Sequence, residues 1–322
     1  MNSHAFALCA LVAATVASAE PQILLFPSLG RPEEVAVQGR VLREAPTPGS
    51  SVLSRNLRRL TAPDWPGAPV EVTFHGSTVK TVAGSDGVFE ARFSFPEGSA
   101  PAPGMREVQA RVPGSWARSV VRVIAADAPF LVISDFDDTV VVTNVTDRAR
   151  FAATALLQDA DTQPAVPGMS ALYQCLVEEQ PAKAGLAFVT GSPHQYAGRV
   201  AAFLALNGFP TAGLYLRDLS PSTLSNYKQP VIRKLLRAVD QSVILIGDSG
   251  ERDPEVYAQI RREYPDRVLA IYIRDAGGSA DARRFQDMVL FKEAREVAAD
   301  AARRGFISEQ CRARNFDAEA KQ

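Results

Sequence analysis

Four uninterrupted apolar runs in the second half of the chain constrain its fold more than any other feature. They span residues 130–133, 186–189, 243–246 and 268–273. Runs without a polar alternation predict strands that are buried on both faces, as in a parallel sheet. Stretches with helical spacing separate them, at residues 169–180, 193–206, 230–239 and 254–263. This alternation predicts a doubly wound α/β domain over residues 127–310, whose chemistry lies beyond the carboxyl ends of the strands.

The first half of the chain has a different pattern. Short runs of alternating polar and apolar residues, such as 70–74, 88–95 and 108–112, are separated by turn signals. This pattern predicts a smaller β-sandwich over residues 20–126, with a role in packing or presentation. Residues 81–89 loosely resemble the strand–turn–strand of transthyretin-like or immunoglobulin-like accessory domains. Leucines at helical spacing predict one short helix within this region, and they are Leu53, Leu57 and Leu60.

Residues 1–19 have the pattern of a signal peptide. An apolar run from Ala5 to Ala17 is followed by Ser18 and Ala19, which completes a small-x-small cleavage pattern. The run is too short to span a membrane, which needs about 20 apolar residues. We therefore expect an exported protein, periplasmic or secreted, that begins at Glu20. The alternative is a buried first helix.

Charge and cysteine content exclude several classes of protein. The 322 residues carry 35 Lys+Arg and 36 Asp+Glu, a balance that argues against a nucleic-acid partner. The three cysteines lack the spacing of a zinc site. Export would permit a disulfide between Cys175 and Cys311. However, Cys175 shares a helical face with Met169 and Leu172, which favours a buried thiol. Residues 311–322 are expected to form a C-terminal tail.

An acidic motif follows the first apolar run. Asp135, Asp137 and Asp138 place three carboxylates within four residues, and these repel one another unless a cation lies among them. Mg²⁺ suits such a site because it takes hard oxygen ligands. Asp135 could attack phosphorus, and Asp137 could protonate the leaving oxygen and then activate water. The alternative is a solvated acidic turn.

The second motif follows the run at 186–189. The Thr190 hydroxyl and nearby backbone N–H groups, such as that of Gly191, could hold phosphate oxygens. Ser192 is expected to be an N-cap residue, because Pro193 would then occupy the first helical position. His194 is expected at a helix surface rather than as a ligand.

Two further groups complete the candidate site. Lys228 precedes the predicted helix 230–239 and could neutralise the transferring phosphoryl group, although such a lysine is most often exposed. Asp248 follows the run at 243–246 and would complete a magnesium site with Asp135 and Asp137. Asp253 is expected to cap the next helix and to orient the metal ligands.

The order of these motifs resembles the haloacid dehalogenase superfamily of phosphohydrolases. More narrowly, residues 130–307 resemble the catalytic domain of the actin-patch-protein phosphatidate phosphatase family, through residues 137–139, 190–193, 246–257 and 271–275. The resemblance implies magnesium-dependent hydrolysis of phosphatidate to diacylglycerol, with Asp135 as nucleophile and Asp137 as acid/base. It also implies phosphate binding by Thr190, Gly191 and Lys228. The implied Mg²⁺ ligands are Asp135, the main-chain carbonyl of Asp137, and Asp248, with Asp253 beside them.

The chain departs from the family in two ways. Thr190 stands where eukaryotic members usually have serine, a mild change that keeps the hydroxyl. The larger departure is the expected export, because characterised members act inside cells, and it bears on the lipid substrate. An exported acid phosphatase or nucleotidase of broad range therefore stays open as an alternative. So does a non-catalytic binding protein on a phosphatase scaffold. Residues 247–250 superficially resemble a serine-protease motif, but they lie between a predicted parallel strand and a helix, which argues against that class.

A segment between the first two motifs could contact a membrane surface. Residues 144–167 combine Arg148 and Arg150 with Phe151, Leu156 and Leu157, an order suited to an anionic lipid surface. The expected substrate is a phosphorylated small molecule or a phosphorylated lipid, and a lipid would require transient contact with a membrane surface. The alternative is that Phe151 and the leucines pack on the sheet.

Overall fold

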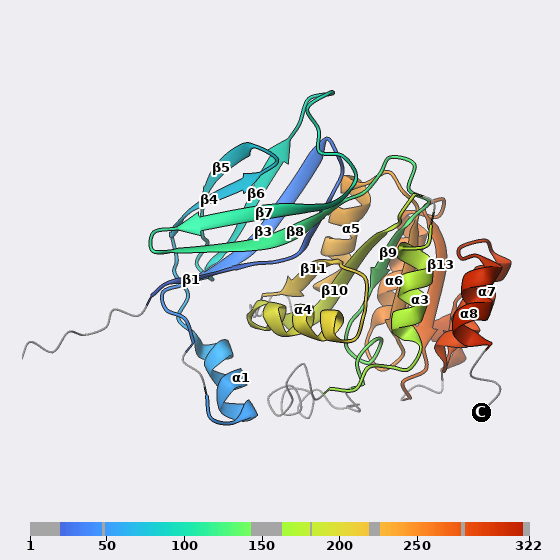
Figure 1. Cartoon of the computed structure of the whole chain (residues 1–322). Coiled ribbons are helices and arrows are strands. Elements are labelled where there is room, and N and C mark those ends of the chain that lie inside the picture. The colour runs from blue at the N-terminus through green and yellow to red at the C-terminus, as the bar shows by residue number, and fades with distance from the viewer. Residues whose placement is uncertain are drawn as a thin grey trace, which may run out of the picture.

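The computed structural model describes residues 20–46, 49–142, 163–180, 182–218, 226–277 and 281–317 (Figure 1). The expected signal peptide and residues 144–162 of the expected membrane-contacting segment lie outside these ranges. Among the described residues, no helix has the length and apolar character needed to cross a membrane.

A six-stranded parallel sheet forms the second half of the chain, as the apolar runs predict. Its strand order is β11-β10-β9-β12-β13-β14, and every neighbouring pair is parallel. The short strands β11 and β14 lie at the two edges, and the four predicted runs form the centre. The strands are β9 (Leu131–Ser134), β10 (Gly185–Pro193), β11 (Gly213–Arg217), β12 (Val243–Asp248), β13 (Val268–Arg274) and β14 (Val289–Phe291).

Helices cover both faces of this sheet, and the central strands are buried on both sides as a result. Val132 of β9 belongs to the core beneath α3, α4 and α7, whereas Leu131 and Ile133 belong to the core beneath α5 and α6. Alternate side chains of one strand thus enter two different apolar cores, which explains the lack of polar alternation. The helices are α3 (Met169–Val177), α4 (Ala197–Leu206), α5 (Lys228–Ala238), α6 (Asp253–Glu263), α7 (Ala294–Arg303) and α8 (Glu309–Phe316), with short 3₁₀ turns η1 (His194–Tyr196) and η3 (Ala282–Phe285).

The first half of the chain forms a second, eight-stranded sheet with its own apolar core. The order is β1-β3-β2-β8-β7-β4-β5, with β6 paired to β3, and all pairs except β2–β8 are antiparallel. In β4 the side chains of Val70, Val72 and Phe74 are buried while their neighbours are exposed, as the alternating pattern predicts. The sandwich arrangement and the domain boundaries stay predictions. The elements are β1 (Gln22–Leu25), β2 (Ser28–Gly30), β3 (Glu34–Leu42), α1 (Val52–Thr61), β4 (Pro69–Phe74), β5 (Ser77–Val82), β6 (Val88–Ser94), β7 (Gly104–Val112) and β8 (Ser115–Val123).

The two sheets meet at the β11 edge of the parallel sheet. Leu214 N of β11 donates a hydrogen bond to Pro27 O, which precedes β2, over 2.9 Å. Lys234 Nζ of α5 also lies 2.5 Å from Glu90 Oε2 of β6. An exposed strand edge invites pairing with other chains, and the segment around β2 covers this one.

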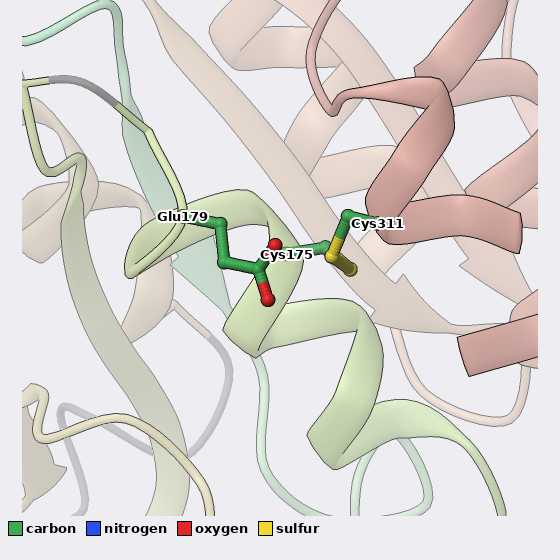
Figure 2. Close-up of side chains that lie close together, drawn as sticks. All are labelled: Cys175, Glu179 and Cys311. Atoms are coloured by element: carbon green, nitrogen blue, oxygen red, sulfur yellow. A yellow bond between two sulfur atoms is a disulfide. The ribbon is translucent and has the colours of Figure 1, made fainter. Parts of the chain in front are cut away.

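The interpretation of Cys175 as a buried thiol is wrong. Cys175 of α3 is bonded to Cys311 of α8, with the two Cα atoms 5.9 Å apart (Figure 2). Both cysteines are buried. The helical pattern predicts this burial for Cys175, but it carries no information about a partner 136 residues away. Residue 311, the expected start of the tail, lies inside α8.

Figure 2 also shows Glu179 near the two sulfur atoms. Its carboxylate pairs with Arg314, and both thiols are consumed by the disulfide. This group is therefore structural rather than a metal site.

Candidate active site

The predicted site residues converge where the strand order of the parallel sheet reverses. Strand β9 lies between β10 and β12, and all three strands end at the same edge. In doubly wound sheets ligands bind in the crevice at this point. The first, second and fourth motifs follow or end these three strands, and the third comes from α5.

Asp135 directly follows β9 and is almost completely buried. Its backbone N–H donates to Ile246 O of β12 over 2.9 Å, which fixes the start of the turn. Its Oδ1 atom lies 2.8 Å from Lys228 Nζ, and the Thr139 hydroxyl is 3.5 Å from Oδ2. Burial raises the pKa of Asp135 well above its usual range, and the charge of Lys228 opposes this shift.

Lys228 is buried among carboxylates and is the first residue of α5. Besides Asp135, its ammonium group contacts Asp253 Oδ1 at 2.5 Å and the half-exposed Glu251 at 3.4 Å. Burial would lower the pKa of Lys228, but the charges of Asp135 and Asp253 outweigh it and hold the pKa well above its usual value. A lysine before a helix is most often exposed, but Lys228 is buried and carries a positive charge.

Asp137 is held by hydroxyl groups of the second motif. Thr190 and Ser192 both donate to Asp137 Oδ2, over 3.1 Å and 2.9 Å. Burial and the charge of Glu251 raise the pKa of Asp137 to about 6, against the lowering effect of these two hydrogen bonds. A carboxyl group with this pKa can hold or release a proton near neutral pH, as a general acid/base requires.

The assignment of Ser192 as an N-cap residue is wrong. Strand β10 continues through Pro193, and α4 begins only at Ala197, after η1. The Ser192 hydroxyl faces Asp137 instead. His194 of η1 is half-buried rather than fully at a surface, with its ring centroid 6.0 Å from that of Phe26.

Asp248 and Asp253 lie together at the end of β12. Asp248 Oδ1 accepts hydrogen bonds from the backbone N–H groups of Gly250 (2.7 Å) and Glu251 (3.1 Å). Burial and the charge of Asp253 raise the pKa of Asp248 to about 8. Asp253 is not the N-cap residue that the sequence predicts, because α6 begins at Asp253 and Arg252 precedes it. Its Oδ2 atom instead accepts from Asp248 N over 3.3 Å.

The carboxylates of Asp135, Asp248 and Asp253 fit a divalent cation. One oxygen of each lies within 4.8 Å of the others. Asp248 Oδ2 is buried and accepts no hydrogen bond from any described residue, while the buried Asp135 Oδ1 has the Lys228 ammonium group 2.8 Å away. A buried acceptor in the state of Asp248 Oδ2, beside two further carboxylates, favours a cation with hard oxygen ligands, such as Mg²⁺. The Asp137 side chain is outside this group and faces Thr190 and Ser192.

The second strand end also has room for a ligand. A Cβ atom at Gly191 would meet no described atom within 4 Å, so the backbone there borders open space. The Thr190 hydroxyl accepts from Ser192 N over 3.0 Å, which curls the backbone around that side chain. Thr190 and Gly191 therefore occupy positions compatible with phosphate binding.

Three residues contribute to the site although no role in it was predicted for them. Ser192 binds Asp137, Glu251 contacts Lys228, and Arg274 supports the turn after β9. Arg274 Nη1 donates to Asp138 O over 2.6 Å, and Asp138 has a left-handed φ of 51°. All three lie inside the motifs that carry the family resemblance. Their place in these motifs was the only sequence feature that could have indicated a role in the site.

Comparisons with known proteins match about half of this chain. An uncharacterised protein of Schizosaccharomyces pombe is 31% identical over 172 residues, which cover 48% of this chain and 28% of that protein. Phosphatidate phosphatase APP1 of Saccharomyces cerevisiae is 29% identical over 174 residues, which cover 51% of this chain and 29% of that protein. The chain thus spans less than a third of the length of either relative.

Among solved structures, a carbohydrate acetylesterase from Xanthomonas citri is 15% identical with a TM-score of 0.34, and the match covers 84% of this chain and 67% of that one. This score is too low to assign a fold. The family model described as the catalytic domain of phosphatidate phosphatase APP1 matches residues 130–275, the segment that holds every residue of the candidate site. The resemblance predicted from the motifs is therefore confirmed: residues 130–275 match the catalytic-domain family of phosphatidate phosphatase APP1.

Proposed function

We propose that this chain is a phosphoric monoester hydrolase that converts phosphatidate to diacylglycerol and phosphate. The family match supports the reaction class and the lipid substrate. The observation that carries the proposal is the buried group of Asp135, Asp248 and Asp253 around Lys228, at the reversal of the strand order. Such a group combines a nucleophile, a cation site and a fixed positive charge in one place.

The chemistry assigned to Asp135 and Asp137 proceeds in two steps. A carboxylate oxygen of Asp135 forms a bond to phosphorus while the bond from phosphorus to the alcohol oxygen breaks, and Asp137 gives its proton to that oxygen. Asp137 then takes a proton from a water molecule, which attacks phosphorus and breaks its bond to Asp135. Phosphate leaves and both carboxylates return to their starting state. The pKa of about 6 suits Asp137 to both directions of proton transfer.

Fixed groups would hold the phosphoryl oxygens during both steps. Lys228 brings a buried positive charge next to the nucleophile, and Asp253 fixes its ammonium group. The Thr190 hydroxyl and the Gly191 backbone would bind phosphoryl oxygens from the end of β10, the strand beside β9. Preorganised charges of this kind stabilise the transition state without reorganisation, which matters for one of the slowest uncatalysed reactions known.

Magnesium is proposed as the cofactor. Asp135, Asp248 and Asp253, with the main-chain carbonyl of Asp137, would hold it. The buried Asp248 Oδ2, which accepts no hydrogen bond from any described residue, supports this assignment. The ion would neutralise the negative charge of the phosphoryl group and of the buried carboxylates.

Export and domain organisation are part of the same proposal. The chain would carry a signal peptide at residues 1–19, a β-sandwich at 20–126 and a haloacid dehalogenase-like domain at 127–310. The Cys175–Cys311 disulfide supports a periplasmic or secreted location, because disulfides persist in oxidising compartments.

A panel of phosphate esters tests the substrate. The purified chain should release phosphate from phosphatidate in the presence of Mg²⁺ and lose this activity with EDTA. Comparable or faster release from nucleotides or sugar phosphates would instead indicate a phosphatase of broad range. No metal-dependent release from any ester would indicate a binding protein on a phosphatase scaffold.

A further inference from the structure

Helix α1 carries two large apolar side chains on its outer face. Leu53 and Leu57 belong to this ten-residue helix, and their side chains are 45% and 50% exposed. Residues four apart lie on the same side of a helix, so the two leucines form one apolar strip. Ser51 caps the helix through a hydrogen bond from Ser54 N, and this local interaction stabilises α1 without burial of its leucines.

The charge of α1 is entirely positive. Residues 52–61 contain Arg55, Arg58 and Arg59 and no acidic residue. The Arg58 side chain is exposed, beside Leu57 in the sequence. Exposed leucines next to arginines, with low overall hydrophobicity, are the features of helices that lie in a lipid–water interface.

The position of α1 connects it to the candidate active site. The helix lies against η1, which directly follows the strand end that carries Thr190 and Gly191. Figure 1 shows α1 standing apart from both sheets, so neither sheet covers this helix.

We propose that α1 docks this protein on an anionic phospholipid surface, an inference that rests on the proposed function for its choice of partner. Leu53 and Leu57 enter the boundary between head groups and acyl chains, and the arginines meet the negative head groups. Docking through α1 places the Thr190 strand end near the membrane, where a phosphorylated lipid would enter. This role is separate from catalysis, because α1 contributes no residue to the site described above.

Vesicle flotation tests the proposal with the full chain. The probes are phosphatidylcholine vesicles with and without about one-fifth phosphatidylserine, an anionic lipid that is not the proposed substrate. Replacement of both leucines, Leu53→Ser with Leu57→Ser, should lower binding to the anionic vesicles about tenfold or more, because the apolar area that inserts is lost. The single variant Leu57→Ser should give a smaller loss in the same direction. Arg58→Gln should weaken binding to anionic vesicles and reduce its dependence on salt.

A matched pair of apolar surface residues provides the control. Val82 of β5 and Met105 of β7 are 64% and 39% exposed, and the double replacement by serine should leave vesicle binding unchanged. Hydrolysis of a small soluble phosphate ester should be equal in all these variants, since none touches the site. Failure of the wild-type chain to bind anionic vesicles would overturn the proposal. So would equal losses in the α1 and control pairs.

The two proposals can fail separately. The chain could bind vesicles through Leu53 and Leu57 and yet have no phosphatase activity. This result would refute the proposed enzymatic function and support the docking role of α1. Phosphatase activity on vesicles that is unaffected by the double replacement would refute the docking role alone.

Discussion

The Ser192 hydroxyl donates a hydrogen bond to Asp137 Oδ2 over 2.9 Å and thereby joins the second strand end to the first. Thr190 donates to the same oxygen. Both bonds favour the ionised form of Asp137, while burial and Glu251 favour the protonated form. The proton affinity of the proposed acid/base is thus set by residues from two neighbouring strands.

Replacement of Ser192 should therefore shift the pH profile of the enzyme. In Ser192→Ala the pKa of Asp137 should rise above about 6, because a hydrogen bond to the ionised form is lost. Asp137 acts as a proton donor in the first step, so the alkaline limb of kcat/KM should move to higher pH. The measurement is the pH dependence of kcat/KM on a soluble phosphate ester.

Ser249 offers a matched control for this change. It is also buried, but its hydroxyl bonds the backbone of residues 276 and 277 rather than Asp137. Ser249→Ala should leave the position of the limb unchanged. An unshifted profile in Ser192→Ala would refute the role assigned to this bond.

Asp248 should make the metal-free protein less stable as the pH rises. Its pKa is raised to about 8 in the folded state, so between about pH 4 and 8 the folded state holds a proton that the unfolded state has lost. The free energy of unfolding should then fall with rising pH, by at most about 1.4 kcal/mol per pH unit for this group.

Urea denaturation at pH 5 and pH 7.5 in EDTA measures the effect. Asp248→Asn cannot titrate and should show a smaller loss of stability between the two pH values. Added Mg²⁺ should flatten the wild-type dependence, because a bound cation favours the ionised carboxylate. An identical pH dependence in Asp248→Asn and wild type would contradict the assigned pKa.

The Cys175–Cys311 disulfide should stabilise the attachment of α8 to α3. It closes a loop of 136 residues, and cross-links of this kind stabilise proteins by about 2–5 kcal/mol. Cys175→Ser should lower the melting temperature of the non-reduced protein, as should Cys311→Ser. The double variant should be no less stable than the single ones. Wild type treated with reductant should approach the same melting temperature, and a reductant without effect would show that the bond is absent in solution.

The central strands and the strand-end residues could be predicted because their signals are local. An apolar run followed by Asp135 or Asp248 is visible within ten residues of sequence. Strands β11 and β14 could not be predicted from the sequence. Strand β11 is only five residues long and mixes polar and apolar residues, and β14 has three residues. Short edge strands are defined by their partners rather than by their own pattern.

The errors at the site arise from contacts between distant residues. Ser192 before Pro193 has the local pattern of an N-cap, but a hydrogen bond to Asp137, 55 positions away, decides its role. Asp253 before Pro254 has the same pattern, and its oxygens serve Lys228 and Asp248 instead. Local propensity cannot reveal such pairings, since they exist only once the sheet has formed.

The most direct test of the account is phosphate release by Asp135→Asn. This variant keeps the shape of the side chain but removes the proposed nucleophile, so turnover with saturating Mg²⁺ should fall to background while the melting temperature indicates a folded protein. Asp266→Asn, at an exposed position outside the site, should retain wild-type activity. Near-wild-type release of phosphate by Asp135→Asn would contradict the proposed covalent mechanism.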